Sequence, residues 1–142
     1  MSKLYTKYTE LKKKDSKKVY LFKSGIFYIS LAEDAELLSE ALGLKLTNLN
    51  EEVIKCGFPI SRLEHYISLL QANNLDFYIV DTNYDKIENY SDYLNNQKLK
   101  QIVEKIITID FDNTTFKEAF DLLYQYSNQL KQIYPAFSTK EE

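Results

Sequence analysis

Several residue types that carry chemistry are scarce in this chain of 142 residues. It has one cysteine, Cys56, and one histidine, His65, so an intramolecular disulfide and a Cys/His metal cluster are both excluded. The three glycines, at positions 25, 43 and 57, fit neither GxGxxG nor GxxxxGKS/T, which excludes these phosphate-binding loops. We therefore expect no cofactor, no metal and no nucleotide.

Long apolar runs and convergent acids are also missing. No stretch approaches the roughly 20 apolar residues that cross a bilayer. The start Met1-Ser-Lys-Leu-Tyr lacks the hydrophobic run of a signal peptide, so we expect a cytoplasmic protein without a membrane partner. Glu33-Asp34 and Glu51-Glu52 are adjacent pairs, whereas acid/base catalysis needs two carboxylates that converge on one bond. No catalytic residue is predicted, and we expect that the chain is not an enzyme.

The composition is that of one ordinary domain with an uneven charge. Apolar residues make up 44% and aromatics 14%, which predicts a single domain over residues 1–137, followed by a disordered tail at 138–142. Residues 1–23 hold eight lysines and two acids, and the other residues hold 10 bases and 19 acids. This basic front suits nucleic-acid phosphates, and it equally suits a helix C-terminus and solubility.

The first half of the chain predicts helix, hairpin, helix. Leu4, Tyr5, Tyr8 and Leu11 form one stripe on a helix over 3–14. Residues 19–22 and 26–31 are β-branched and aromatic runs joined through Gly25, which is typical of two strands and a tight turn. From Ala32 the apolar spacing becomes helical, and Gly43 predicts the end of that helix.

The remaining elements continue this alternation. Strands are predicted at 44–49, 53–58 and 77–80, and a capping box at Ser61–Glu64 predicts a helix start. Residues 83–100 predict a loop with a short helix, and Ile107, Ile109 and Phe111 alternate as in a strand. A second capping box, Thr115-Phe-Lys-Glu118, opens a final helix whose apolar stripe contains Phe116, Phe120, Leu123 and Leu130. The predicted class is α/β, a mixed β-sheet flanked by helices.

A set of ordered elements runs from about Tyr8 to Asp81. Its members are Tyr8-Thr-Glu-Leu-Lys12, Gly25-Ile-Phe27-Tyr28, Asp34-Ala35, Leu46-Thr47, Gly57-Phe-Pro59 and Leu63-Glu-His-Tyr66. In order and spacing this set resembles the N-terminal mismatch-recognition domain, domain I, of the MutS DNA mismatch repair family. The resemblance implies a stand-alone domain with the mixed sheet of that family.

The resemblance also implies a DNA-reading site. The family inserts the phenylalanine of a Phe-x-Glu tip into the minor groove at a mispair, and Phe27 matches that wedge. Gly25 matches the turn before the wedge, Lys23 the basic residue of the strand, and Gly57 and Pro59 the neighbouring loop that approaches the same groove. Ile29 occupies the glutamate position, so the aromatic wedge is kept and the polar contact to the base is lost.

Two functions follow from this departure. The first is weak, salt-sensitive binding of mismatched or distorted double-stranded DNA through Phe27 and the lysine-rich front, without an ATPase. The second is an interaction or regulatory module that kept the fold, lost mismatch recognition and binds a protein partner. It is motivated by Ile29 and by the acidic excess of residues 24–142.

Overall fold

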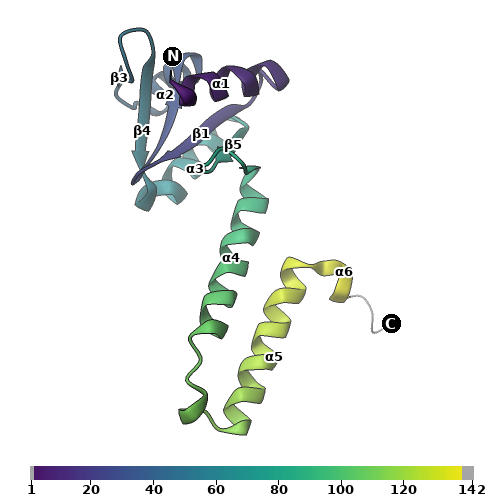
Figure 1. Ribbon diagram of the computed structural model, residues 1–142. Helices are drawn as coiled ribbons and strands as arrows, with labels where there is room; N and C mark the ends of the chain where they lie inside the picture. Colours follow the sequence, from purple (N-terminus) through teal and green to yellow (C-terminus); the bar gives the residue numbers. More distant parts are fainter. Residues whose placement is uncertain (1, 139–142) are drawn as a thin grey trace. The chain divides into compact units, whose positions relative to one another are not determined.

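The computed structural model describes residues 2–138, and the chain divides into two compact units, one ending at Tyr90 and the other beginning at Ser91. Within the described residues, the first unit holds a six-stranded sheet in the order β3-β4-β2-β1-β5-β6 (Figure 1). Its strands are β1 (Val19–Ser24), β2 (Phe27–Leu31), β3 (Thr47–Asn48), β4 (Ile54–Pro59), β5 (Phe77–Val80) and β6 (Ile87–Glu88). That residues 1–137 form a single domain remains a prediction.

The sheet is mixed, as predicted. β1 pairs with β5 in parallel, and the other neighbouring strands pair antiparallel. The hairpin of β1 and β2 and the buried strand β5 confirm their predictions closely. Of the strand predicted at 44–49, only Thr47–Asn48 pairs, and it pairs with β4.

Helix α1 (Lys3–Lys14) covers one face of the sheet, and its bounds and stripe confirm the prediction. The Ser2 side chain caps it by accepting a hydrogen bond from the Tyr5 amide at 3.1 Å. Tyr8 and Leu11 are buried in a cluster with side chains from β1, β2 and β5, together with Val53. The strand members of this cluster are Tyr20, Phe22, Ile29, Leu31 and Val80.

Helices α2 (Ala32–Leu42) and α3 (Leu63–Ala72) pack on the opposite face of the sheet, the face that carries Cys56 and Phe58. Leu38, Ile67 and Leu70 are almost fully buried there. Gly43 ends α2 with φ of 75°, a left-handed conformation that favours glycine, so the predicted cap is confirmed.

The capping box predicted at Ser61–Glu64 is wrong. Ser61 lies inside a short 3₁₀ helix, η1 (Ile60–Arg62), and α3 begins at Leu63 without a side-chain cap. The cause lies in the sheet, because β4 continues through Pro59 and the Ile60 amide donates to the Ile26 carbonyl at 2.8 Å. This hydrogen bond fixes the backbone at the residue that precedes Ser61. Residues 60–62 then form the 3₁₀ helix, in which the Ser61 side chain does not cap α3.

The second unit contains two long helices, α4 (Tyr90–Ile107) and α5 (Phe116–Ile133), where α4 begins at the last residue of the first unit. The strand predicted over the second half of 102–111 is wrong, and so is the loop with only a short helix at 83–100. A strand needs a neighbour to pair with, whereas the amides of Thr108 and Ile109 donate back to Glu104 and Ile106 as a helix end does. The polar residue Asn95 also interrupts the apolar stripe of α4, so the helical spacing of that stripe is difficult to recognise in the sequence.

The connection after α4 and the start of α5 are well defined. A 3₁₀ helix, η2 (Phe111–Asn113), precedes the capping box of Thr115 and Glu118, whose two reciprocal hydrogen bonds confirm the predicted helix start. The predicted stripe of α5 is largely exposed, with Phe116 at 96%. A short helix, α6 (Pro135–Ser138), follows, and the predicted disordered tail otherwise lies outside the described residues.

Across residues 2–138, no helix combines the length and the apolar character that crossing a membrane requires.

Candidate nucleic-acid interface

The tip of the β1–β2 hairpin carries two exposed apolar side chains. Ser24 pairs with Phe27, so only Gly25 and Ile26 form the turn. Gly25 has φ of 60° and Ile26 has a negative φ, the arrangement of a type II′ turn, which needs glycine at its first central position. Ile26 is 73% exposed and Phe27 is 42% exposed. The turn therefore presents an aromatic ring to solvent at the end of a sheet.

This tip is tied to the neighbouring strands on both sides. β2 lies between β1 and β4, and Phe27 pairs with Pro59 across the second of these contacts. The Ile60 amide donates to the Ile26 carbonyl at 2.8 Å, which ties the turn to the strand end beside it. On the opposite face, Phe58 stacks on Tyr66 with ring centroids 4.5 Å apart. A side chain on such a support loses little conformational freedom when it binds.

The sheet register separates the predicted site residues into two groups. Phe27 and Pro59 are partners, as are Ile29 and Gly57, and their side-chain positions share the face that α1 covers. Lys23 pairs with Tyr28, so its side chain belongs to the opposite face. Four of the six predicted residues therefore meet on one face, with Gly25 in the turn at their end, and Lys23 does not join them.

Beside Phe27 the same face contains a surface depression of about 250 Å³. Its lining includes two lysines that sequence reasoning missed, Lys45 and Lys55, together with Thr47. Lys55 is brought there by pairing with Leu31 on one side and Thr47 on the other. The alternation of β4 was the available signal, because it places Lys55 and Gly57 on one face.

Ile29 forms part of the floor of this depression and is also a core residue. Its side chain is 7% exposed and belongs to the cluster that contains Tyr8 and Phe22. Gly57 lies opposite, where an added Cβ would approach the Tyr28 carbonyl oxygen to 2.5 Å and the Ile29 Cγ2 to 2.8 Å. The close strand approach therefore requires glycine at position 57, and an apolar side chain at position 29 fills the space above it.

The lysine-rich front is partly committed to structure. Lys12 Nζ donates to Asp34 Oδ1 at 2.8 Å and to the carbonyls of Ser16 and Lys18 at 2.9 and 3.0 Å. Lys18 Nζ lies 3.3 Å from the Asp76 carboxylate. These contacts join α1, the start of β1 and α2, so Lys12 in particular stabilises the fold and is not available to bind phosphate.

Burial changes the protonation of several groups behind the site. It raises the pKa of the Asp34 carboxyl, while the hydrogen bonds from Lys12 and the Tyr20 amide oppose that rise. Burial, followed by the charge of Asp15, raises the pKa of the Tyr20 hydroxyl to about 12. Burial also raises the pKa of the Cys56 thiol to about 11, with a smaller effect from Asp34. A thiol of this kind is a poor nucleophile, because the thiolate is the reactive form.

Within residues 2–138, no group of three or more His, Cys, Asp or Glu side chains is arranged to hold a metal ion. His65 is exposed on α3 with its ring against the edge of Tyr66, their centroids 5.0 Å apart. The arrangement at the hairpin tip offers stacking and electrostatic contacts.

Comparisons with known proteins agree with the mixed sheet of the first unit. A family model described as MutS domain I matches residues 2–111. The DNA mismatch repair protein MutS of Rickettsia akari is 32% identical over 111 residues, which cover 75% of this chain and 12% of that protein. MutS of Rickettsia typhi is 37% identical over 84 residues, which cover 56% of this chain and 9% of that protein.

MutS of Azorhizobium caulinodans is 36% identical over 76 residues, which cover 51% of this chain and 8% of that protein. The chain therefore spans about a tenth of the length of the curated relatives it matches. The family match ends at residue 111, so α5 lies beyond it.

Proposed function

This chain belongs to the MutS domain I family, and we propose that it binds mismatched or distorted double-stranded DNA weakly, with Phe27 as an aromatic wedge. The observation that carries the proposal is the exposed Phe27 ring at a hairpin tip that is paired on both sides, beside a depression lined by Lys45 and Lys55. An aromatic side chain stacks on an unpaired base for about 1–3 kcal/mol, and a wedge kinks a duplex that is already weakened.

Each site residue has a role in this proposal. Gly25 makes the turn, and Gly57 and Pro59 support the strand behind the wedge. Ile29 provides an apolar floor and makes no hydrogen bond to a base, so recognition depends on stacking and on the deformability of the duplex. Lys23 contributes charge from the opposite face of the hairpin.

Two lysines near Phe27 add contacts to the DNA backbone in this proposal. Lys45 and Lys55, which line the depression on one side of Phe27, neutralise backbone phosphates next to the inserted ring, and this makes binding salt-dependent. Phosphate contacts fix the position of the protein on the duplex and carry no sequence information. The chain acts in the cytoplasm, and neither nucleotide binding nor catalysis by these residues is part of the proposed role.

Fluorescence anisotropy tests the wedge. We expect a labelled G·T duplex to bind more tightly than its matched homoduplex, and Phe27→Ala to lower affinity for the G·T duplex about tenfold, the equivalent of 1.4 kcal/mol. Phe116→Ala is the control, since Phe116 is 96% exposed on α5 and lies beyond the family match. Equal binding of both duplexes that is unaffected by Phe27→Ala would leave electrostatic attraction alone and contradict the wedge.

A second function has its own support. The exposed apolar residues of α5, among them Phe116, Phe120 and Leu123, suit a protein partner better than a phosphate backbone. If neither duplex binds below about 100 µM, the weak end of non-specific DNA binding, DNA recognition by this chain is refuted and the protein-interaction role is favoured. Retained DNA binding in a variant with Phe116, Phe120 and Leu123 changed to serine would show that the two surfaces are separate.

A further inference from the structure

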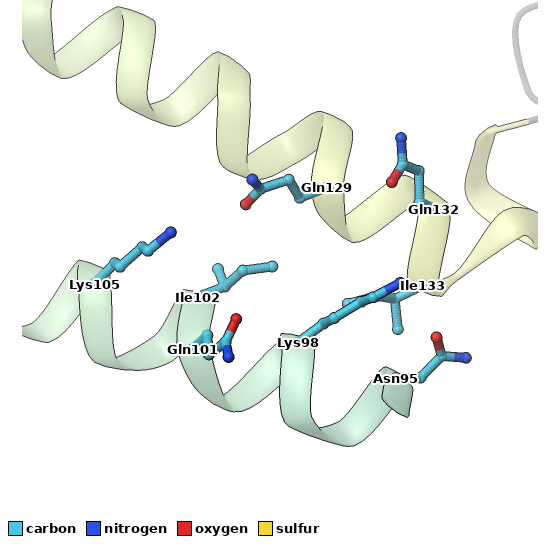
Figure 2. Close-up of a pocket in the computed structure, with 8 residues that line it drawn as sticks. All are labelled: Asn95, Lys98, Gln101, Ile102, Lys105, Gln129, Gln132 and Ile133. Carbon is cyan, nitrogen blue, oxygen red and sulfur yellow. The ribbon is translucent and has the colours of Figure 1, made fainter. Parts of the chain in front are cut away.

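A second candidate site lies within the second unit, between α4 and α5. The cleft has a volume of about 260 Å³, and its polar lining comes from both helices. Figure 2 shows Lys98 and Lys105 extending from α4 toward α5. We call it the amide-lysine cleft, after its polar residues Asn95, Lys98, Gln101, Lys105, Gln129 and Gln132. Ile102, which is 5% exposed, and Ile133 complete the lining.

The charge in this cleft has one sign. All eight lining residues are described, and none of them carries a carboxylate, although acids outnumber bases in the whole chain. Glu118 lies on the same side of α5 as Gln129, but eleven residues away, or about 16 Å along the helix. Its carboxylate is also engaged by the Thr115 amide and hydroxyl at 2.9 and 3.1 Å. The two ammonium groups therefore have no neutralising partner within the lining.

The lining chemistry is that of a phosphate site. Lysine ammonium groups and the amides of asparagine and glutamine are common donors to phosphate oxygens. Lys98, Gln101 and Lys105 follow one line along α4 at spacings of three and four residues. The two lysines are seven residues apart, about 10.5 Å along the helix axis. Phosphates on one DNA strand rise about 3.4 Å each along the duplex axis and also turn around it, so two lysines at this separation contact different phosphates of one backbone.

We propose that the amide-lysine cleft binds phosphate groups, through ion pairs from Lys98 and Lys105 and hydrogen bonds from Gln129 and Gln132. The phosphates belong to a nucleic-acid backbone, and the DNA part of this inference rests on the proposed function. A free phosphate ion shares the same chemistry and is distinguished by the test. The cleft then gives the second unit its own backbone contact, independent of the Phe27 wedge.

The first test measures the salt dependence of binding by the full chain to a matched homoduplex. Each lost phosphate contact lowers the slope of log affinity against log salt by about 0.9, so the double variant Lys98→Gln/Lys105→Gln lowers it by about 1.8. The control Lys100→Gln/Lys131→Gln removes the same amount of charge outside the cleft, one lysine from α4 and one from α5, and leaves the slope unchanged. Circular dichroism verifies that both variants keep their helices.

The second test uses inorganic phosphate as the probe and needs no DNA binding. We expect the side-chain amide resonances of Gln129 and Gln132 to shift in a phosphate titration, and the shifts to vanish in Lys98→Gln/Lys105→Gln. Phosphate shifts with an unchanged DNA slope identify free phosphate as the ligand. If the cleft variant and its control affect DNA binding alike and phosphate moves neither resonance, the proposal is overturned. Failure of the wedge appears instead as an ineffective Phe27→Ala, so the two failures are distinguishable.

Discussion

Ile29 lies directly over Gly57. The two residues are partners across β2 and β4, and a Cβ at position 57 would come within 2.8 Å of the Ile29 Cγ2. Ile29 belongs to the core cluster on this face of the sheet, and both residues line the depression beside Phe27. Changes at either residue therefore test the architecture on which the wedge depends.

Gly57→Ala is expected to destabilise the protein by about 1–3 kcal/mol, the usual cost of overpacking. The added methyl meets the Tyr28 carbonyl oxygen at 2.5 Å as well as Ile29, and the backbone contact cannot be relieved by a rotamer change. Urea unfolding measures the loss. In a double-mutant cycle with Ile29→Ala, the loss caused by Gly57→Ala should be smaller than in the wild type, and simple additivity would contradict direct contact.

Ile29→Glu is expected to lower the free energy of unfolding by about 3 kcal/mol, because it places a carboxylate in an apolar cluster at a position that is 7% exposed. Ile29→Val, the control, should lose only about 1 kcal/mol. An acid at position 29 is therefore expected to destabilise the fold. Urea unfolding measures this loss of stability separately from any gain in mismatch preference.

The loss in Ile29→Glu should depend on pH. Burial raises the folded-state pKa of the introduced carboxyl above its unfolded value of about 4.3, so the folded state binds more protons between these two values. The stability deficit relative to the wild type should then shrink as the pH falls through the folded pKa toward about 4. A deficit that is constant between pH 7 and pH 4 would show that the carboxyl reaches solvent.

Asp34→Ala should be severely destabilising, by about 3 kcal/mol. Asp34 is 2% exposed, and its removal leaves the Tyr20 amide without this acceptor and the Lys12 ammonium without its charged partner. Asp121→Ala is the matched control, since Asp121 lies 3.0 Å from Lys117 on the surface of α5. That exposed pair should contribute less than about 0.5 kcal/mol. Equal losses in urea unfolding would mean that burial does not strengthen the Lys12 contact.

The protein should lose stability in mild alkali through Cys56. The folded-state pKa of the thiol is about 11, above its ordinary value, so the unfolded state loses its proton first and the free energy of unfolding falls as the pH rises. The loss begins near pH 9 and reaches about 1 kcal/mol at pH 10. Urea unfolding of Cys56→Ala should show a shallower decline from pH 7 to pH 10. An identical decline in both proteins would assign the effect to other groups.

The elements with local signals were predicted well. The stripe of Tyr8 and Leu11 specified α1, Gly25 specified the hairpin turn, and Thr115 with Glu118 specified the start of α5, because each signal acts within a few residues. Ser61 shows the opposite case. Its capping box satisfied the local rule, but the hydrogen bond between Ile60 and Ile26 joins segments that are distant in sequence and overrides it.

Local patterns in the sequence were sufficient to predict the mixed α/β class, the hairpin with Phe27 beside its turn, and the lack of a phosphate-binding glycine loop. The set of residues that share the face of the wedge depends instead on tertiary contacts. These contacts bring Lys45 and Lys55 to Phe27, place Lys23 on the opposite face and make Ile29 a core residue. The physical reason is that strand pairing sets register and facing across long sequence separations, whereas sequence patterns report only the neighbours of each residue.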